Sequence, residues 1–156
     1  MRITGPYNAV IPLLSAAVFL AIAAPSECST DQTPRAQALR HHNTGVELAR
    51  HGRLDEAIAE YDAGIALDPS ISSLYYARAK AYTELRQFQP ALTDLNKALE
   101  LDPDKPQYYY ERAVVYHALG DRARAEADVH SVLAVTSDPD YVYPAMNLLN
   151  RIVGGD

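Results

Sequence analysis

The chain has 156 residues, of which 48% are hydrophobic, and its 14 basic and 20 acidic side chains give a formal net charge of −6. This length allows one domain and a short leader, and the apolar share is enough for one core. The acidic balance argues against a nucleic-acid partner, because phosphate contacts need a clustered basic surface. Cys28 is the only cysteine, which excludes an intramolecular disulfide and a thiolate metal cluster.

An uncharged apolar segment lies close to the amino terminus. Residues 9–24 hold no charged side chain and follow Arg2. The run is shorter than the ~20 residues of a usual membrane-spanning helix. The sequence Ala21-Ile22-Ala23 fits the small-residue rule for signal-peptidase cleavage. We therefore predict a signal peptide over residues 1–23, with cleavage after Ser26 as the second choice.

The alternative interpretation of this segment is an uncleaved N-terminal anchor. A lipid anchor at Cys28 is disfavoured, because Pro25-Ser26-Glu27 precedes the cysteine instead of a small apolar run. With Arg2 held inside, the rest of the chain crosses the membrane in either case. We expect an exported protein, periplasmic or secreted, or else a membrane-anchored one with its folded part outside the cytoplasm. Residues 24–35 are polar and are predicted to form a disordered linker.

An internal repeat dominates the remainder of the chain. Leu67-Asp68-Pro69 recurs as Leu101-Asp102-Pro103, and we call the sequence offset between these two segments the repeat period. The same offset relates two further sets, which are Tyr75, Tyr76, Arg78, Ala79 and Tyr82, and Tyr109, Tyr110, Arg112, Ala113 and Tyr116. Self-similarity at a fixed period indicates stacked repeats. We place the repeats at about 38–71, 72–105 and 106–139, within a domain spanning 36–153.

Each repeat is predicted to contain two helices, because its apolar and aromatic residues recur at helical spacing. The first helices are expected near 37–50, 72–85 and 106–119, and the second helices near 54–67, 88–101 and 122–136. Gly52 and Gly120 suit the left-handed conformation that ends a helix. A capping helix is expected at 141–153, and it tolerates Pro144 only if it begins at about 141–143.

These residues resemble the tetratricopeptide repeat, whose pattern runs aromatic, Leu, small residue, Tyr, then Ala, aromatic and Pro. The middle repeat carries this pattern as Tyr75, Arg78, Ala79, Tyr82, Ala91, Leu95 and Pro103. The resemblance implies an all-α fold, a right-handed α-solenoid of three helix–turn–helix repeats plus a C-terminal capping helix. Small residues are expected where the two helices of a repeat cross, with Gly45, Ala79 and Ala113 facing Ala57, Ala91 and Ala125.

Catalytic and metal-binding motifs are missing from the sequence. The five histidines show no H-E-x-x-H spacing, and there is neither a Gly-rich phosphate loop nor a G-x-S-x-G elbow. We therefore predict no enzyme, no cofactor and no metal site. Arg78 and Arg112 recur at the repeat period, and a structural role is expected for them. Their stems would cover apolar surface while their charges pair with carboxylates such as Asp94 or Glu111.

The resemblance also implies a concave wall lined by the first helices. The predicted partner-binding groove consists of residues on the outward face of these helices, which are His42, Val46, Arg50, Tyr76, Lys80, Tyr110, Val114 and His117. Aromatic anchors with a few positive charges suit an extended peptide or a partner helix. The alternative is that these tyrosines only cover neighbouring helices.

Members of the family that bind a terminal carboxylate hold it with Lys, Asn, Asn, Lys and Arg. The matching positions in this chain are His42, Val46, Ala77, Gln107 and Glu111, so that function is not predicted. We expect a non-catalytic scaffold or adaptor with a protein or peptide partner, and neither nucleic acid nor a small-molecule substrate. Membrane contact is expected only through an uncleaved N-terminal segment. The alternative is a structural subunit that self-associates, or an accessory subunit of an exported complex.

Overall fold

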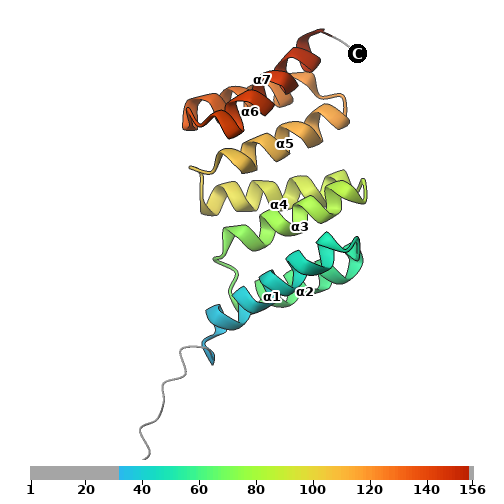
Figure 1. The fold of residues 1–156 in the computed structure, drawn as a ribbon, viewed down its shortest axis with the longest axis vertical. Coiled ribbons are helices and arrows are strands. Elements are labelled where there is room, and N and C mark those ends of the chain that lie inside the picture. The colour runs from blue at the N-terminus through green and yellow to red at the C-terminus, as the bar shows by residue number, and fades with distance from the viewer. Residues whose placement is uncertain (1–31, 155–156) are drawn as a thin grey trace, which may run out of the picture.

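The computed structural model describes residues 32–154, and within this range the chain forms seven α-helices and no strand (Figure 1). The helices in chain order are α1 (Pro34–Arg50), α2 (Leu54–Leu67), α3 (Ser72–Glu84), α4 (Phe88–Leu101), α5 (Pro106–Ala118), α6 (Arg122–Val135) and α7 (Pro139–Gly154). The expected leader lies outside the described residues. Among those residues, no helix is long and apolar enough to cross a membrane.

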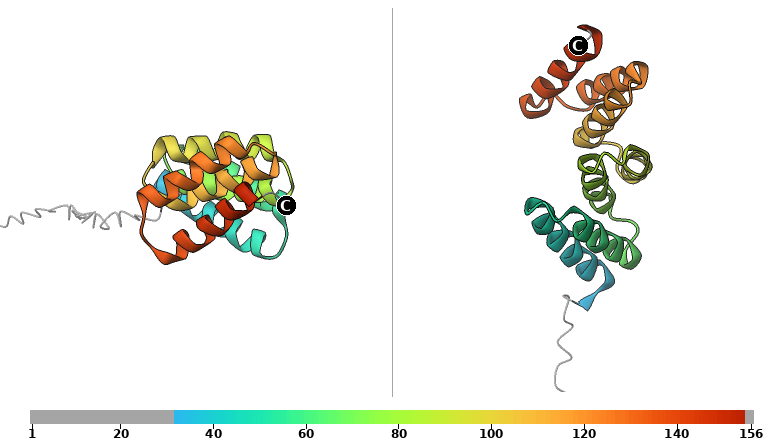
Figure 2. Two further views of the ribbon diagram at one scale, coloured as in Figure 1. Left: turned by 90° about the horizontal axis from the view of Figure 1, so that it is seen from above. Right: turned by 90° about the vertical axis from the view of Figure 1, so that its right-hand side faces the viewer.

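The helices pair in chain order, α1 with α2, α3 with α4 and α5 with α6, and the pairs stack along one axis (Figure 1). The first helices also contact one another along the stack, from α1 through α3 and α5 to α7. The second helices α2, α4 and α6 make no such contacts with each other. The first helices therefore converge on the inner, concave side (Figure 2). The expected all-α solenoid is confirmed.

The turn inside each pair uses one recurrent motif. Gly52, Arg86 and Gly120 occupy equivalent positions in the three repeats and have positive φ angles of 74°, 58° and 77°. In each turn the amide of the following residue donates to a carbonyl five residues back, as Gln87 does to Tyr82 at 2.8 Å. This pattern closes the end of a helix with one left-handed residue. The predicted role of the two glycines is confirmed, and Arg86 occupies the same conformation without being glycine.

The amino-terminal boundary differs from the prediction. Helix α1 begins at Pro34, with the Thr33 hydroxyl accepting a hydrogen bond from the Ala36 amide at 3.1 Å. Arg35 forms an ion pair with Asp68 at 3.0 Å. The predicted disordered linker was therefore wrong in extending to residue 35. A threonine followed by proline is a helix-start signal, since the side chain caps a free amide and proline needs no donor.

The carboxy-terminal helix also begins earlier than expected, at Pro139. Pro144 is then the sixth residue of α7 and lies inside the helix. The prediction that the helix tolerates Pro144 only by beginning at about 141–143 was therefore wrong. A proline there removes the hydrogen bond that its amide would donate to the Asp140 carbonyl. Asp140 is exposed, so that carbonyl can bind water. Packing of α7 on its neighbours outweighs the loss of one hydrogen bond.

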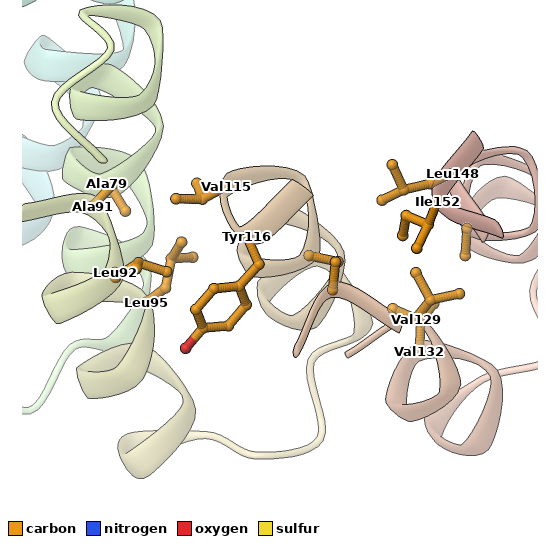
Figure 3. Packing of buried hydrophobic residues seen from close by; sticks show 13 residues of the cluster. Ala79, Ala91, Leu92, Leu95, Val115, Tyr116, Val129, Val132, Leu148 and Ile152 are labelled. Atoms are coloured by element: carbon orange, nitrogen blue, oxygen red, sulfur yellow. The ribbon is translucent and has the colours of Figure 1, made fainter. Parts of the chain in front are cut away.

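The core runs from one repeat into the next. The largest cluster of buried side chains joins α3 and α4 to α5, α6 and α7. In Figure 3, Leu148 and Ile152 of α7 point towards Val129 and Val132 of α6. A second cluster holds α1, α2 and α3 together. Continuous burial across repeats is what stabilises a solenoid, because a single pair of helices cannot cover its own apolar face.

The small residues at the helix crossings are buried as predicted, and their partners vary in a compensating way. A Cβ atom added to Gly45 would lie 2.4 Å from the ring of Tyr61. The equivalent pairs in the next repeats are Ala79 with Leu95 and Ala113 with Val129, all fully buried. A smaller residue on the first helix thus accompanies a larger one on the second, which preserves packing density.

Candidate peptide-binding groove

The recurrent arginines are structural, as expected. Arg78 on α3 donates from Nε and Nη2 to both carboxylate oxygens of Asp94 on α4, at 2.7 and 2.6 Å. Its remaining nitrogen Nη1 pairs with Asp62 on α2. Glu111, the other partner considered from the sequence, makes no ion pair with it. The Asp94 hydrogen bonds raise the pKa of Arg78 above its ordinary value, against the lowering effect of burial.

The same arrangement recurs one repeat later. Arg112 on α5 donates to both oxygens of Asp128 on α6, at 2.8 and 2.7 Å, and to Asn96 on α4 at 2.7 Å. Each arginine therefore joins the second helix of its own repeat to that of the preceding one. Asp94 and Asp128 are only 3% and 5% exposed, so these bidentate bonds satisfy buried carboxylates. We call each of these arginines, with its hydrogen-bond partners on two second helices, an arginine clamp. The clamp holds successive second helices at a fixed spacing.

One pocket opens between α1 and α3 on the concave side, with a volume of about 360 Å³. Five of the eight predicted groove residues line it, and these are His42, Val46, Arg50, Tyr76 and Lys80. Its remaining walls come from residues that the prediction left out, namely Ala49, Tyr61, Ala77, Ala81 and Glu84. The pocket is therefore apolar at its base and charged at its rim.

A second pocket of about 720 Å³ lies further along the same row of helices, between α5 and α7. The other three predicted residues line it, and these are Tyr110, Val114 and His117. Its far wall belongs to α7 and is formed by Pro144, Asn147, Leu148 and Arg151. The eight predicted residues thus fall into two pockets on one succession of first helices. Binding of a partner to either pocket stays a prediction.

Tyr76 lines the first pocket and also packs on the neighbouring helix α5. Its ring lies 4.8 Å from the ring of Tyr108 on α5, centroid to centroid. The Lys80 ammonium lies 6.0 Å from the centroid of the Tyr76 ring. Burial, with a smaller contribution from nearby Glu111, raises the pKa of Tyr76 well above its ordinary value. The tyrosine thus covers the neighbouring helix with its ring and also borders the groove.

Three charged groups, Lys80, Glu84 and Glu111, influence one another without forming an ion pair among the described residues. Glu111 on α5 makes no hydrogen bond or ion pair with any described residue. Burial raises the pKa of its carboxyl group, attraction by Lys80 lowers it, and repulsion by Glu84 raises it. Lys80 likewise has no ion-pair partner among the described residues. Lys80 and Glu84 line the first pocket, whereas Glu111 lines neither pocket.

Sequence reasoning missed Glu84 and the whole α7 wall. Glu84 stands one repeat period after Arg50, so the repeat register could have found it. The α7 wall could not have been found in this way, because Asn147 stands one repeat period after Ala113, which is fully buried at a helix crossing. The packing of the Tyr76 ring on Tyr108 could not have been predicted from the repeat period.

The histidines do not assemble a metal centre within residues 32–154, where no group of three or more metal-ligand side chains occurs. His41 instead contacts Glu60 at 2.7 Å, and His130 lies 3.7 Å from Glu126. Glu60 stands where the later repeats have Asp94 and Asp128. His41 thus bridges the helices of the first repeat, where Thr44 replaces the clamping arginine.

Comparison with known proteins agrees with this geometry. A family model described as a TPR repeat matches residues 45–86 and 80–120. The first TPR domain of Spaghetti (RPAP3), solved with the HSP90 peptide SRMEEVD, is 30% identical to this chain. The alignment covers 77% of this chain and 93% of that domain, with a TM-score of 0.73. This chain belongs to the tetratricopeptide repeat family. No curated protein sequence matches it.

Other tetratricopeptide domains give similar values. The first TPR domain of human RPAP3 is 30% identical over 78% of this chain and 92% of that domain, with a TM-score of 0.72. The second human domain, solved with the HSP70 peptide SGPTIEEVD, is 26% identical over 77% and 98%, with a TM-score of 0.71. Two of these three domains were solved with a peptide, and the alignments cover 77–78% of this chain.

Proposed function

We propose that this chain is a non-catalytic scaffold that binds an extended segment of a partner protein along α1, α3, α5 and α7. The observation that carries the proposal is the pair of pockets on successive first helices. The related domains solved with HSP90 and HSP70 peptides support the peptide as a class of ligand. A groove with an apolar base and a charged rim favours a segment that combines apolar side chains with charge.

The proposed segment is internal rather than carboxy-terminal. The positions that would hold a terminal carboxylate are His42, Val46, Ala77, Gln107 and Glu111. Glu111 has no ion-pair partner within the described residues and would repel such a group. Since Lys80 is the cation beside Tyr76, we expect an acidic side chain of the segment to pair with it.

Site-specific photocrosslinking tests the assignment of the groove. A photoreactive residue replaces Val46 or Val114, one in each pocket, and matched controls carry it at the exposed Thr93 or at Lys97 on α4. We expect one partner to be captured from both groove positions and not from α4. Equal capture from α4 would show that the partner binds the convex side. The peptide SRMEEVD serves as a negative control, and its tight binding would contradict the internal-segment proposal.

The proposed place of action is outside the cytoplasm, on the basis of the uncharged segment over residues 9–24. Sequencing the amino terminus of the protein purified from cells tests this. A start near residue 24 or 27 is expected after cleavage. An intact amino terminus on protein that stays in the cytoplasm would contradict it.

A further inference from the structure

Helix α7 takes the place that a first helix has in the complete repeats. Helix α7 packs on α6 and α5 in the way that α5 packs on α4 and α3. It is therefore the first helix of a fourth repeat, and no second helix of that repeat exists within the described residues.

In the complete repeats, one face of the first helix packs on the second helix. In α5, for example, Tyr116 is only 8% exposed, and Arg112 reaches across to Asp128 of α6. On α7 one side is open to solvent, with Tyr143 70% exposed, Met146 42% and Val153 66%. We call Tyr143, Met146, Asn150 and Val153 the α7 stripe. Its sequence spacings of three, four and three residues place it along one side of the helix.

The opposite side of α7 packs on the preceding helices of the stack. Ala145, Leu148 and Ile152 are buried against the stack. Residues 141–150 carry no charge at all, whereas the terminal element of a solenoid normally needs a polar outer face. A helix that is apolar on two sides is normally covered on both. The α7 stripe therefore needs an occupant that supplies an apolar helix face.

We propose that the occupant is α7 of a second copy of this chain, packed antiparallel about a two-fold axis. The stripe is complementary to itself in that orientation. Residues 143 and 153 lie equally far from residue 148, and so do residues 146 and 150. Tyr143 then faces the partner's Val153, and Met146 faces the partner's Asn150. A two-fold contact of this kind closes on itself and forms a dimer rather than a filament.

Each α7 in this dimer covers the exposed side of the other. The three-four-three spacing is the one by which paired helices interlock, and one polar Asn among apolar contacts fixes the register of such a pair. The stripe holds no charged residue, so the pairing buries no unpaired ion. The groove-lining residues Pro144, Asn147 and Arg151 lie on a different side of α7, and both grooves stay open.

Sedimentation equilibrium of the purified full chain tests the dimer. The contact is small, and we expect a dissociation constant on the order of micromolar or weaker. Met146→Glu should weaken the dimer by about tenfold or more, since it places a charge in an apolar contact. Leu119→Glu is the matched control, because Leu119 is 43% exposed and lies outside the stripe. Circular dichroism verifies that both variants keep their helices.

Three results would overturn the proposal. The wild-type chain stays monomeric at concentrations well above this value, Met146→Glu leaves the association unchanged, or Leu119→Glu weakens it equally. Thiol crosslinking tests the register, with Cys28→Ser as the background. Tyr143→Cys with Val153→Cys in one chain should give covalent dimers, and each single variant should not. Crosslinking of Val153→Cys alone would contradict the antiparallel register.

Discussion

At the scale of single residues, the turn at Arg86 departs from its two equivalents. Gly52 and Gly120 adopt a positive φ without steric cost, whereas Arg86 has a Cβ atom in the same conformation, with φ of 58°. Left-handed backbone costs an L-residue roughly 1–2 kcal/mol. The Arg86 side chain is exposed and makes no hydrogen bond or ion pair with any described residue that could offset this cost. No side-chain contact with a described residue therefore offsets the backbone strain at Arg86.

Arg86→Gly should stabilise the protein by about 0.5–1 kcal/mol, because relief of the strain exceeds the added freedom of the unfolded chain. Urea denaturation followed by circular dichroism measures the change. Gly120→Ala is the mirror control and should destabilise by about 1 kcal/mol, because a φ of 77° disfavours a residue with a Cβ atom. Nothing lies within 4 Å of the added Cβ atom, so the loss reports backbone strain and not a clash. A loss of stability in Arg86→Gly would show that the arginine has a role that the contacts do not account for.

Gly45 illustrates the opposite case, a residue kept small by its neighbour. Gly45→Ala should destabilise by about 1–3 kcal/mol, because the new methyl group overlaps the buried ring of Tyr61. Adding Tyr61→Leu reproduces the Ala79–Leu95 pair of the next repeat and should recover part of the loss. Thermal unfolding of the single and double variants measures both effects. A neutral Gly45→Ala would mean that the ring can move aside.

The Glu111 carboxyl makes stability depend on pH. Burial raises its pKa above the ordinary 4.5. A raised pKa in the folded state means that Glu111 favours folding most when protonated, and that this contribution is lost as the pH rises through the folded-state pKa. Glu111→Gln should therefore be more stable than the wild type at neutral pH. Urea denaturation across pH should show the gap closing below about pH 4.5, and a constant gap would contradict it.

At the scale of helices, the arginine clamps tie each repeat to the one before. Arg78→Met should destabilise by about 2–4 kcal/mol, because Asp94 is left buried without its partner. Arg50→Met is the control, since its contact with Glu47 is exposed and worth well under about 1 kcal/mol. Adding Asp94→Leu to Arg78→Met should recover much of the loss. Equal losses of stability in Arg78→Met and Arg50→Met would contradict the proposed role of the Arg78 clamp.

Periodicity allowed most of the helices to be predicted, because the same spacing of apolar residues recurs three times. It did not locate the ends of the stack. Helix α1 starts at Pro34 because Thr33 caps it, a local signal that the repeat pattern does not contain. Helix α7 tolerates Pro144 because Ala145, Leu148 and Ile152 are buried against the stack. Tertiary packing of this kind leaves no mark in local propensity.

The groove was only partly predictable for a related reason. The repeat register predicts that His42, Tyr76 and Tyr110 lie on the inner face of the first helices. In the structure these residues line the two pockets there. It could not reveal that the Tyr76 ring packs on Tyr108, or that Glu111 lies near Lys80 and Glu84 without an ion pair. Those relations join different helices and depend on how far apart the helices stand.

At the scale of the whole molecule, the two pockets follow one another along α1, α3, α5 and α7, and the α7 stripe lies on another side of α7. The chain thus has one surface suited to a partner segment and another suited to a second copy. In the proposed dimer, two grooves would be joined through the carboxy-terminal helices. Such a dimer would bind a partner with two suitable segments more tightly than either groove alone.

The most direct test of the account is the affinity of the crosslinked segment for two charge-reversed variants. Lys80 borders the groove without an ion pair to any described residue, whereas Lys97 lies on α4 and contacts Glu100 at 3.0 Å. Isothermal titration calorimetry should show Lys80→Glu binding about tenfold more weakly than the wild type, and Lys97→Glu binding equally well. Unchanged affinity in a folded Lys80→Glu variant, or an equal loss in Lys97→Glu, would contradict binding in the groove.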